Sequence, residues 1–219
     1  AVISVLRPGF ASGSHVKVLL LEASIIGLAA VGQTFVILTG GIDMSVPWIF
    51  TAGAMAAYVS GRLENANSVL VILLILVGGF LLGMINGTAV AYLGVPSIVM
   101  TIGLNTILQG GVTGLTSGAV NGVAPGIMYT LATGSVFNIS YGFILWMVMT
   151  VLVMLILRKT KYGRSLYALG NSRGVVFFSG IQRKRVEALA YGISGLFAAM
   201  AGMLMVGKTG SAYLGMGNP

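Results

Sequence analysis

Charged side chains are scarce in this 219-residue chain, and acidic ones are almost absent. Asp and Glu together number 4, only 7% of residues are charged, and 57% are hydrophobic. The mean hydropathy is accordingly +1.00. Such a composition leaves too little polar surface to cover a water-soluble globule. The sequence therefore predicts an integral membrane protein.

Cysteine is absent, and His15 is the single histidine. Without cysteine the chain has no disulfides and no thiolate metal sites, and four scattered acids are too few for a carboxylate metal centre. A catalytic nucleophile, base and orienting group cannot be assembled from these residues either. We therefore expect no enzymatic activity, no metal and no bound cofactor in this chain.

One short motif, at residues 202–209, matches the phosphate-binding pattern G-x-x-x-x-G-K-[ST]. The residues between its glycines are all apolar, and they end a predicted spanning helix instead of forming a loop. The chain also lacks the acids that a nucleotide site uses to hold Mg²⁺. We therefore interpret the match as coincidental, with Lys208 at the membrane interface.

Long apolar stretches dominate the remainder of the chain. Crossing ~30 Å of hydrocarbon takes about 20 mostly apolar residues. We predict such helices at residues 18–39, 69–93, 97–115, 143–157 and 186–206. A shorter helix over residues 47–60 follows a break between Gly40 and Pro47, because proline suits a first helical turn; whether it spans the membrane fully is left open. The predicted fold class is an all-α polytopic transmembrane helix bundle with one broken helix.

The connecting segments differ in composition, which predicts their sides of the membrane. Eight of the 12 basic residues lie between positions 158 and 185. Because cytoplasmic loops carry an excess of Lys and Arg, this segment is predicted to be cytoplasmic, with one or two short surface helices. Counting back along the chain places the turn at 94–96 inside. The segment near Arg62 and an uncharged loop at 118–141 are then outside.

Small residues recur every four positions in three of the predicted spans. Such faces let helix backbones approach closely. We therefore predict close helix packing at three sets: Gly79, Gly83 and Gly87; Gly110, Gly114 and Gly118; and Ser194, Ala198 and Gly202.

Asp43 is the one ionisable residue between Glu22 and Arg62. Ionisable residues inside a membrane are costly and usually functional. Irregular backbone is tolerated there only where protein or a water-filled cavity satisfies its polar groups. Two roles remain open at this point: Asp43 caps the helix that begins near Pro47, or it contacts a solute.

Other polar side chains in the spans are candidates for lining a solute pathway. Asn105 and Gln109 are four residues apart and therefore share a helix face. For any single residue, hydrogen bonding between helices is the alternative role. The candidate pathway residues are Gln33, Asp43, Ser45, Asn86, Asn105 and Gln109.

Three blocks of sequence resemble the permease subunits of bacterial ATP-binding-cassette importers for simple sugars of the ribose, xylose and galactose type. Residues 32–46 contain the pattern G-G-I-D-[LM]-S-V, residues 86–87 and 95–103 form the second block, and residues 158–181 form the third. The chain departs from the family pattern at Pro47, where glycine is usual. It departs again at residues 172–178, where an acidic, alanine-rich run is usual.

The resemblance implies that residues 1–219 form a single permease domain, a fragment lacking the family's first span and several C-terminal spans. It implies sugar translocation across the bacterial inner membrane, with ATP bound and hydrolysed by separate ATPase subunits. A second permease copy or paralogue, a periplasmic solute-binding protein and membrane lipid are the other implied partners, and nucleic acid is not one. Neither the sugar nor the choice between homodimer and heterodimer follows from the sequence.

The same resemblance identifies residues 158–185 as the cytoplasmic coupling loop. The residues that it implies at the ATPase contact are Arg164, Gly170, Asn171, Ser179, Gly180 and Ile181. An alternative is an ion-coupled secondary transporter or channel, in which Asp43 carries a proton or cation through the broken helix.

Overall fold

The computed structural model describes residues 13–62, 67–116, 122–137, 139–171 and 180–218. Within these ranges, five helices are long and apolar enough to cross a membrane. They are α2 (Gly13–Leu38), α4 (Ser68–Leu93), α5 (Ser97–Thr116), α7 (Tyr141–Lys159) and α10 (Arg183–Thr209). Each coincides with a predicted span to within a few residues. The all-α polytopic bundle is therefore confirmed.

The helix break near Gly40 is also confirmed. Helix α2 ends at Leu38, and α3 (Val46–Ser60) begins one residue before Pro47. At 1.5 Å per residue, the 15 residues of α3 extend about 22 Å. Because Trp48, Ile49 and Phe50 at its start are buried, α3 begins inside the bundle and not at its edge.

The uncharged segment 118–141 is not wholly a loop, so that prediction is wrong for residues 126–133, 135–136 and 139–140. It contains α6 (Gly126–Thr133) and a small antiparallel hairpin of β1 (Ser135–Val136) and β2 (Ile139–Ser140). The eight-residue α6 buries Met128 and Ala132, which are four positions apart on one face. So short a helix between Pro125 and Gly134 offers too few residues for an apolar period to be recognised.

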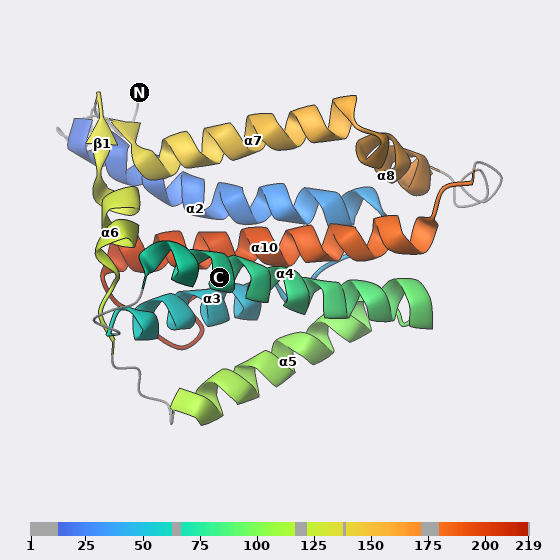
Figure 1. The fold of residues 1–219 in the computed structure, drawn as a ribbon, viewed down its shortest axis with the longest axis horizontal. Coiled ribbons are helices and arrows are strands. Elements are labelled where there is room, and N and C mark those ends of the chain that lie inside the picture. Colours follow the sequence, from blue (N-terminus) through green and yellow to red (C-terminus); the bar gives the residue numbers. More distant parts are fainter. Residues whose placement is uncertain (1–12, 63–66, 117–121, 138, 172–179, 219) are drawn as a thin grey trace, which may run out of the picture.

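Helix α10 forms the centre of the bundle. It contacts α2, α3, α4 and α6, and Figure 1 shows it running through the middle of the molecule. Most of its side chains are buried. The resemblance to a phosphate-binding loop at residues 202–209 falls inside this helix, which confirms that the match is coincidental. Lys208 pairs with Glu22 of α2 at 2.6 Å.

Glycine faces bring α4 and α3 against α10. A methyl group added at Gly83 would collide with the carbonyl oxygen of Tyr191, and one at Gly202 with that of Phe50. These sets pack as predicted. The described part of the α5 set does not: a methyl group added at the exposed Gly110 or Gly114 would meet no atom of another element within 4 Å. Gly118 lies outside the described residues.

The connectors fall at two opposite ends of the bundle. Figure 1 shows α8 (Lys161–Asn171) at the end opposite α6 and β1. At the α8 end, Lys184 Nζ lies 5.3 Å from the centre of the Tyr92 ring, so α10 begins where α4 ends. At the α6 end, Val123 N–H donates to Tyr58 O at 3.1 Å. This arrangement agrees with the predicted order of crossings. The assignment of the α8 end to the cytoplasm stays a prediction.

Candidate solute-pathway and coupling site

Residues 39–45, called here the linker, join α2 to α3 through irregular backbone. Gly40 has φ +79°, a left-handed conformation that glycine adopts without strain. Two linker N–H groups are satisfied by the first turns of α5: Ile42 N donates to Ser97 Oγ at 3.3 Å, and Met44 N to Thr101 Oγ1 at 3.0 Å. Protein groups therefore supply the hydrogen bonds that lipid cannot, as the sequence required.

Asp43 is buried in the bundle, with 2% of its surface exposed. Its Oδ1 accepts hydrogen bonds from Ser45 N at 3.0 Å and Ser45 Oγ at 2.6 Å. Its Oδ2 accepts from Ser194 Oγ of α10 at 2.8 Å. The carboxylate thus lies among hydroxyl and amide donors, and the ion pairs of the described chain do not include it.

The contacts of Asp43 differ from those of a helix cap. Ser45 occupies the N-cap position of α3, and its side chain makes no capping hydrogen bond. The Asp43 carboxylate instead links the linker to α10. Whether it also contacts a solute stays a prediction.

Two amide side chains extend this buried cluster. Asn86 of α4 is fully buried and donates from Nδ2 to Ser45 Oγ at 2.8 Å. Gln33 of α2 donates from Nε2 to the backbone oxygen of Asp43 at 3.2 Å. Four predicted pathway residues therefore meet around the linker, which is held by α2, α4, α5 and α10.

The other two predicted pathway residues lie apart from this cluster. Asn105 is half-buried and Gln109 is exposed, both on α5 beyond its attachment to the linker. Their proposed contact with solute stays a prediction.

Sequence reasoning missed the hydroxyl partners of the linker as site residues. Ser194 was assigned to helix packing because it belongs to a stripe of small residues. Ser97 and Thr101 begin α5, directly after the turn at residues 94–96. The sequence shows the hydroxyl groups at these positions. A single sequence does not show which positions face another helix, so their role could not be recognised.

Helix α8 packs against the end of α2 just before the linker. A side chain at Gly170 would collide with the carbonyl oxygen of Leu38. Tyr162 stacks on Phe35 of α2, with ring centres 6.2 Å apart, and its hydroxyl donates to Val186 O of α10 at 3.3 Å. Burial raises the pKa of the Tyr162 hydroxyl, which therefore remains a neutral donor. Helix α8 is thus fixed to both α2 and α10.

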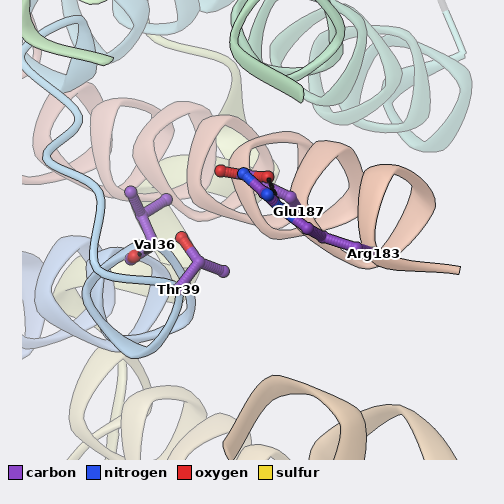
Figure 2. A network of polar contacts seen from close by, with 4 residues as sticks. All are labelled: Val36, Thr39, Arg183 and Glu187. Carbon is purple, nitrogen blue, oxygen red and sulfur yellow. Dashed lines mark hydrogen bonds and ion pairs between the residues drawn. The ribbon is translucent and has the colours of Figure 1, made fainter. Parts of the chain in front are cut away.

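Figure 2 shows the same end of α2 beside the first turns of α10. Thr39 Oγ1 donates to Val36 O at 2.8 Å, which closes the last turn of α2. Arg183 Nε lies 3.4 Å from Glu187 Oε2 one turn along α10. Glu187 is buried in this pair, while the Arg183 side chain is partly exposed.

The predicted coupling residues lie on α8 and in the segment just before α10. Arg164 and Asn171 are exposed on α8, and Gly180 is exposed with φ +66°. Ile181 is half-buried and accepts from Arg183 N at 2.8 Å. Ser179 lies outside the described residues.

A hollow of about 610 Å³ lies between α8 and the end of α2. Its walls include Leu38 and Gly40 on one side and Tyr167, Gly170 and Asn171 on the other. It therefore brings two predicted coupling residues next to the linker. In the described part of the chain, no three His, Asp or Glu side chains lie together as a metal site would require.

Comparison with known proteins identifies the family. Residues 16–218 match the family model described as branched-chain amino acid transport system / permease component. The chain belongs to this permease family. Membership agrees with the five apolar helices, and the chain is a multi-pass protein of the inner membrane. The ion-coupled alternative is not favoured by these similarities.

Several sugar permeases are similar to this family member. It is 32% identical to the ribose import permease protein of Haemophilus influenzae, over 97% of this chain and 67% of that protein. It is 30% identical to the D-allose transport system permease protein of Escherichia coli, over 95% of this chain and 64% of that protein. Identity to the fructose import permease protein of Rhizobium meliloti is 27%, over 92% and 58% respectively.

The permease chain thus spans about two thirds or less of the length of these curated relatives. No solved structure matches it.

Proposed function

We propose that this chain forms the translocating part of an ATP-driven importer for a simple sugar. The observation that supports this most strongly is membership of the permease family, together with relatives named for ribose, fructose and allose import. A pathway for a hydroxyl-rich solute requires polar groups inside an apolar bundle. Gln33, Asp43, Ser45 and Asn86 supply such groups around the linker.

The solute route runs along the outward face of α5. Beyond Leu104 this helix has no buried residue in the described chain, although Asn105, Thr106, Gln109 and Thr113 are polar. Polar groups that face hydrocarbon are costly, so this face meets water or another protein in the membrane. A second permease copy or paralogue that presents the same face encloses a route lined by amides and hydroxyls.

The energy of ATP hydrolysis reaches this route through the α8 end of the bundle. The hollow between α8 and α2 is the docking place of the ATPase subunit, and exposed Arg164 supplies positive charge on the same helix, α8. Force on α8 is transmitted through the Gly170–Leu38 contact to the last turn of α2 and so to the linker. A periplasmic binding protein delivers the sugar from the opposite side.

The proposal is tested by reconstituting the full-length permease with its ATPase and solute-binding protein in liposomes. Uptake of labelled ribose, fructose, allose and leucine is measured with and without ATP. We expect ATP-dependent uptake of one sugar and none of leucine. Uptake of leucine, or of no sugar in the panel, would overturn the assignment to sugars.

A further inference from the structure

The linker is attached to α5 only through the first turns of that helix. Thr101 and Leu104 are the two buried residues of α5 within the described chain. Along its length α5 diverges from α4, as Figure 1 shows. Gly110, Gly111 and Gly114 in the later part of α5 have open space around them. Helix α5 is thus attached most firmly at its first turns, and the rest of it packs against the core only through partly buried side chains such as Leu108 and Val112.

Two hydroxyl groups attach the first turns of α5 to the linker. Thr101 Oγ1 is fully buried and accepts the Met44 N–H at 3.0 Å, while its own proton goes to Ser97 O at 2.9 Å. Ser97 Oγ accepts the Ile42 N–H at 3.3 Å. These two N–H groups belong to irregular backbone and have no helical acceptor. Loss of either hydroxyl therefore leaves a backbone donor unsatisfied inside the membrane.

The turn that precedes α5 is short and loosely packed. Gly94 ends α4 with φ +71°, and Pro96 comes directly before α5. The ends of α4 and α5 are therefore joined by a three-residue turn that carries no side-chain packing at Gly94. Movement of the linker would therefore shift the first turns of α5 and, with them, the more loosely packed remainder of the helix.

We propose that Ser97 and Thr101 are positioning residues that couple the linker to α5, so that displacement of α8 tilts the pathway face of α5. This inference rests on the proposed function, because it assumes that α5 lines the route. The mechanical sequence is α8, the last turn of α2, the linker, and then α5. Thr101 is the main attachment because its contact is the shorter and is fully buried.

The test compares three variants in the reconstituted full-length importer. Thr101→Val removes the acceptor while keeping the side-chain shape, and Thr101→Ser restores the hydroxyl. Thr150→Val is the matched control, because Thr150 lies on α7, outside the pathway face of α5, and its hydroxyl donates only to Trp146 O of its own helix, at 2.8 Å. Solute transported per ATP hydrolysed is measured for each variant.

We expect Thr101→Val to lower the transport-to-hydrolysis ratio at least five-fold, with Thr101→Ser and Thr150→Val near wild type. A spin-label pair at Leu115→Cys on α5 and Val148→Cys on α7 supplies a second readout, which does not depend on turnover. Its distance distribution shifts on ATP binding in the parent protein, and this shift is lost with Thr101→Val.

Two results would overturn the inference: an unchanged ratio in Thr101→Val, or an ATP-dependent distance shift that survives that substitution. If the parent protein itself shows no ATP-dependent sugar uptake, the proposed function fails instead. The distance shift still decides the coupling of α8 to α5 in that case. A drop in the ratio that Thr101→Ser does not restore would also count against the hydroxyl.

Discussion

Asp43 owes its position to hydroxyl donors from two parts of the chain, Ser45 in the linker and Ser194 on α10. A hydrogen bond contributes about 0.5–1.5 kcal/mol net to stability, and Asp43 accepts three of them. The buried carboxylate is therefore a strong attachment between the linker and the central helix. Its contact with Ser194 joins residues 151 positions apart in the chain.

Ser194→Ala removes one donor and leaves Asp43 Oδ2 unpaired. We expect this to cost about 1–3 kcal/mol of stability, because an unsatisfied buried acceptor keeps its full desolvation penalty. The measurement is the thermal unfolding midpoint in detergent. Ser60→Ala is the control, since its hydroxyl donates only to Ala57 O in its own helix. Equal midpoints for the two variants would contradict the account.

Part of this cluster was predictable from the sequence. Gln33, Asp43, Ser45 and Asn86 stand out because each is a polar residue within an apolar run, and the structure brings all four together. Ser194 does not stand out, because a serine in a stripe of small residues serves packing and hydrogen bonding equally well. Only the three-dimensional crossing of α10 with the linker distinguishes the two.

At the scale of helices, the crossing of α4 and α10 is set by glycines that face carbonyl groups. Gly79, Gly83 and Gly87 each lack room for a methyl group against α10. Backbones at this crossing are therefore closer than any side chain would permit. The spacing of these glycines predicted the contact, but it also predicted one on α5 that the described chain does not make.

Gly83→Ala tests this crossing directly. Its methyl group would collide with Tyr191 O, so we expect α4 to separate from α10 and the unfolding midpoint to fall by several degrees. Gly78→Ala is the matched control, because nothing lies within 4 Å of that position. Alanine there favours the helix by up to about 1 kcal/mol. A midpoint for Gly83→Ala at or above that of Gly78→Ala would show that the crossing is not tight.

Gly170→Leu tests the contact between α8 and α2. The added side chain would meet Leu38 O, so we expect α8 to be displaced and ATP hydrolysis to be uncoupled from uptake. ATP binding to the isolated ATPase stays unchanged. Gly180→Leu acts by a different cause, since φ +66° strains any other residue. Gly126→Leu, at an open position at the other end, is the control. Normal uptake in the Gly170 variant would argue against coupling through α8.

Long helices were easier to predict from the sequence than short ones. The five spans are runs of about 20 apolar residues, a length that few other structures require. Helix α8 was anticipated as a short surface helix in the basic segment. Helix α6 was missed because only two of its eight residues are buried, which is too few to show a helical period in the sequence.

For the whole molecule, the central claim about topology is that the basic α8 end faces the cytoplasm. The absence of cysteine from these 219 residues allows single reporters at chosen positions. In spheroplasts, a membrane-impermeant maleimide is expected to label Val123→Cys at the α6 end and not Arg185→Cys at the α8 end. The reverse labelling pattern would mean that the α8 end faces the periplasm. A cytoplasmic ATPase could not reach α8 in that orientation.

Solute uptake by the complete importer, measured after the proton gradient is collapsed while ATP is maintained, tests most directly whether transport is driven by ATP. We expect uptake to continue, because energy enters through α8 from an ATPase and not through protonation of Asp43. Uptake that stops with the gradient, although ATP remains, would contradict this expectation.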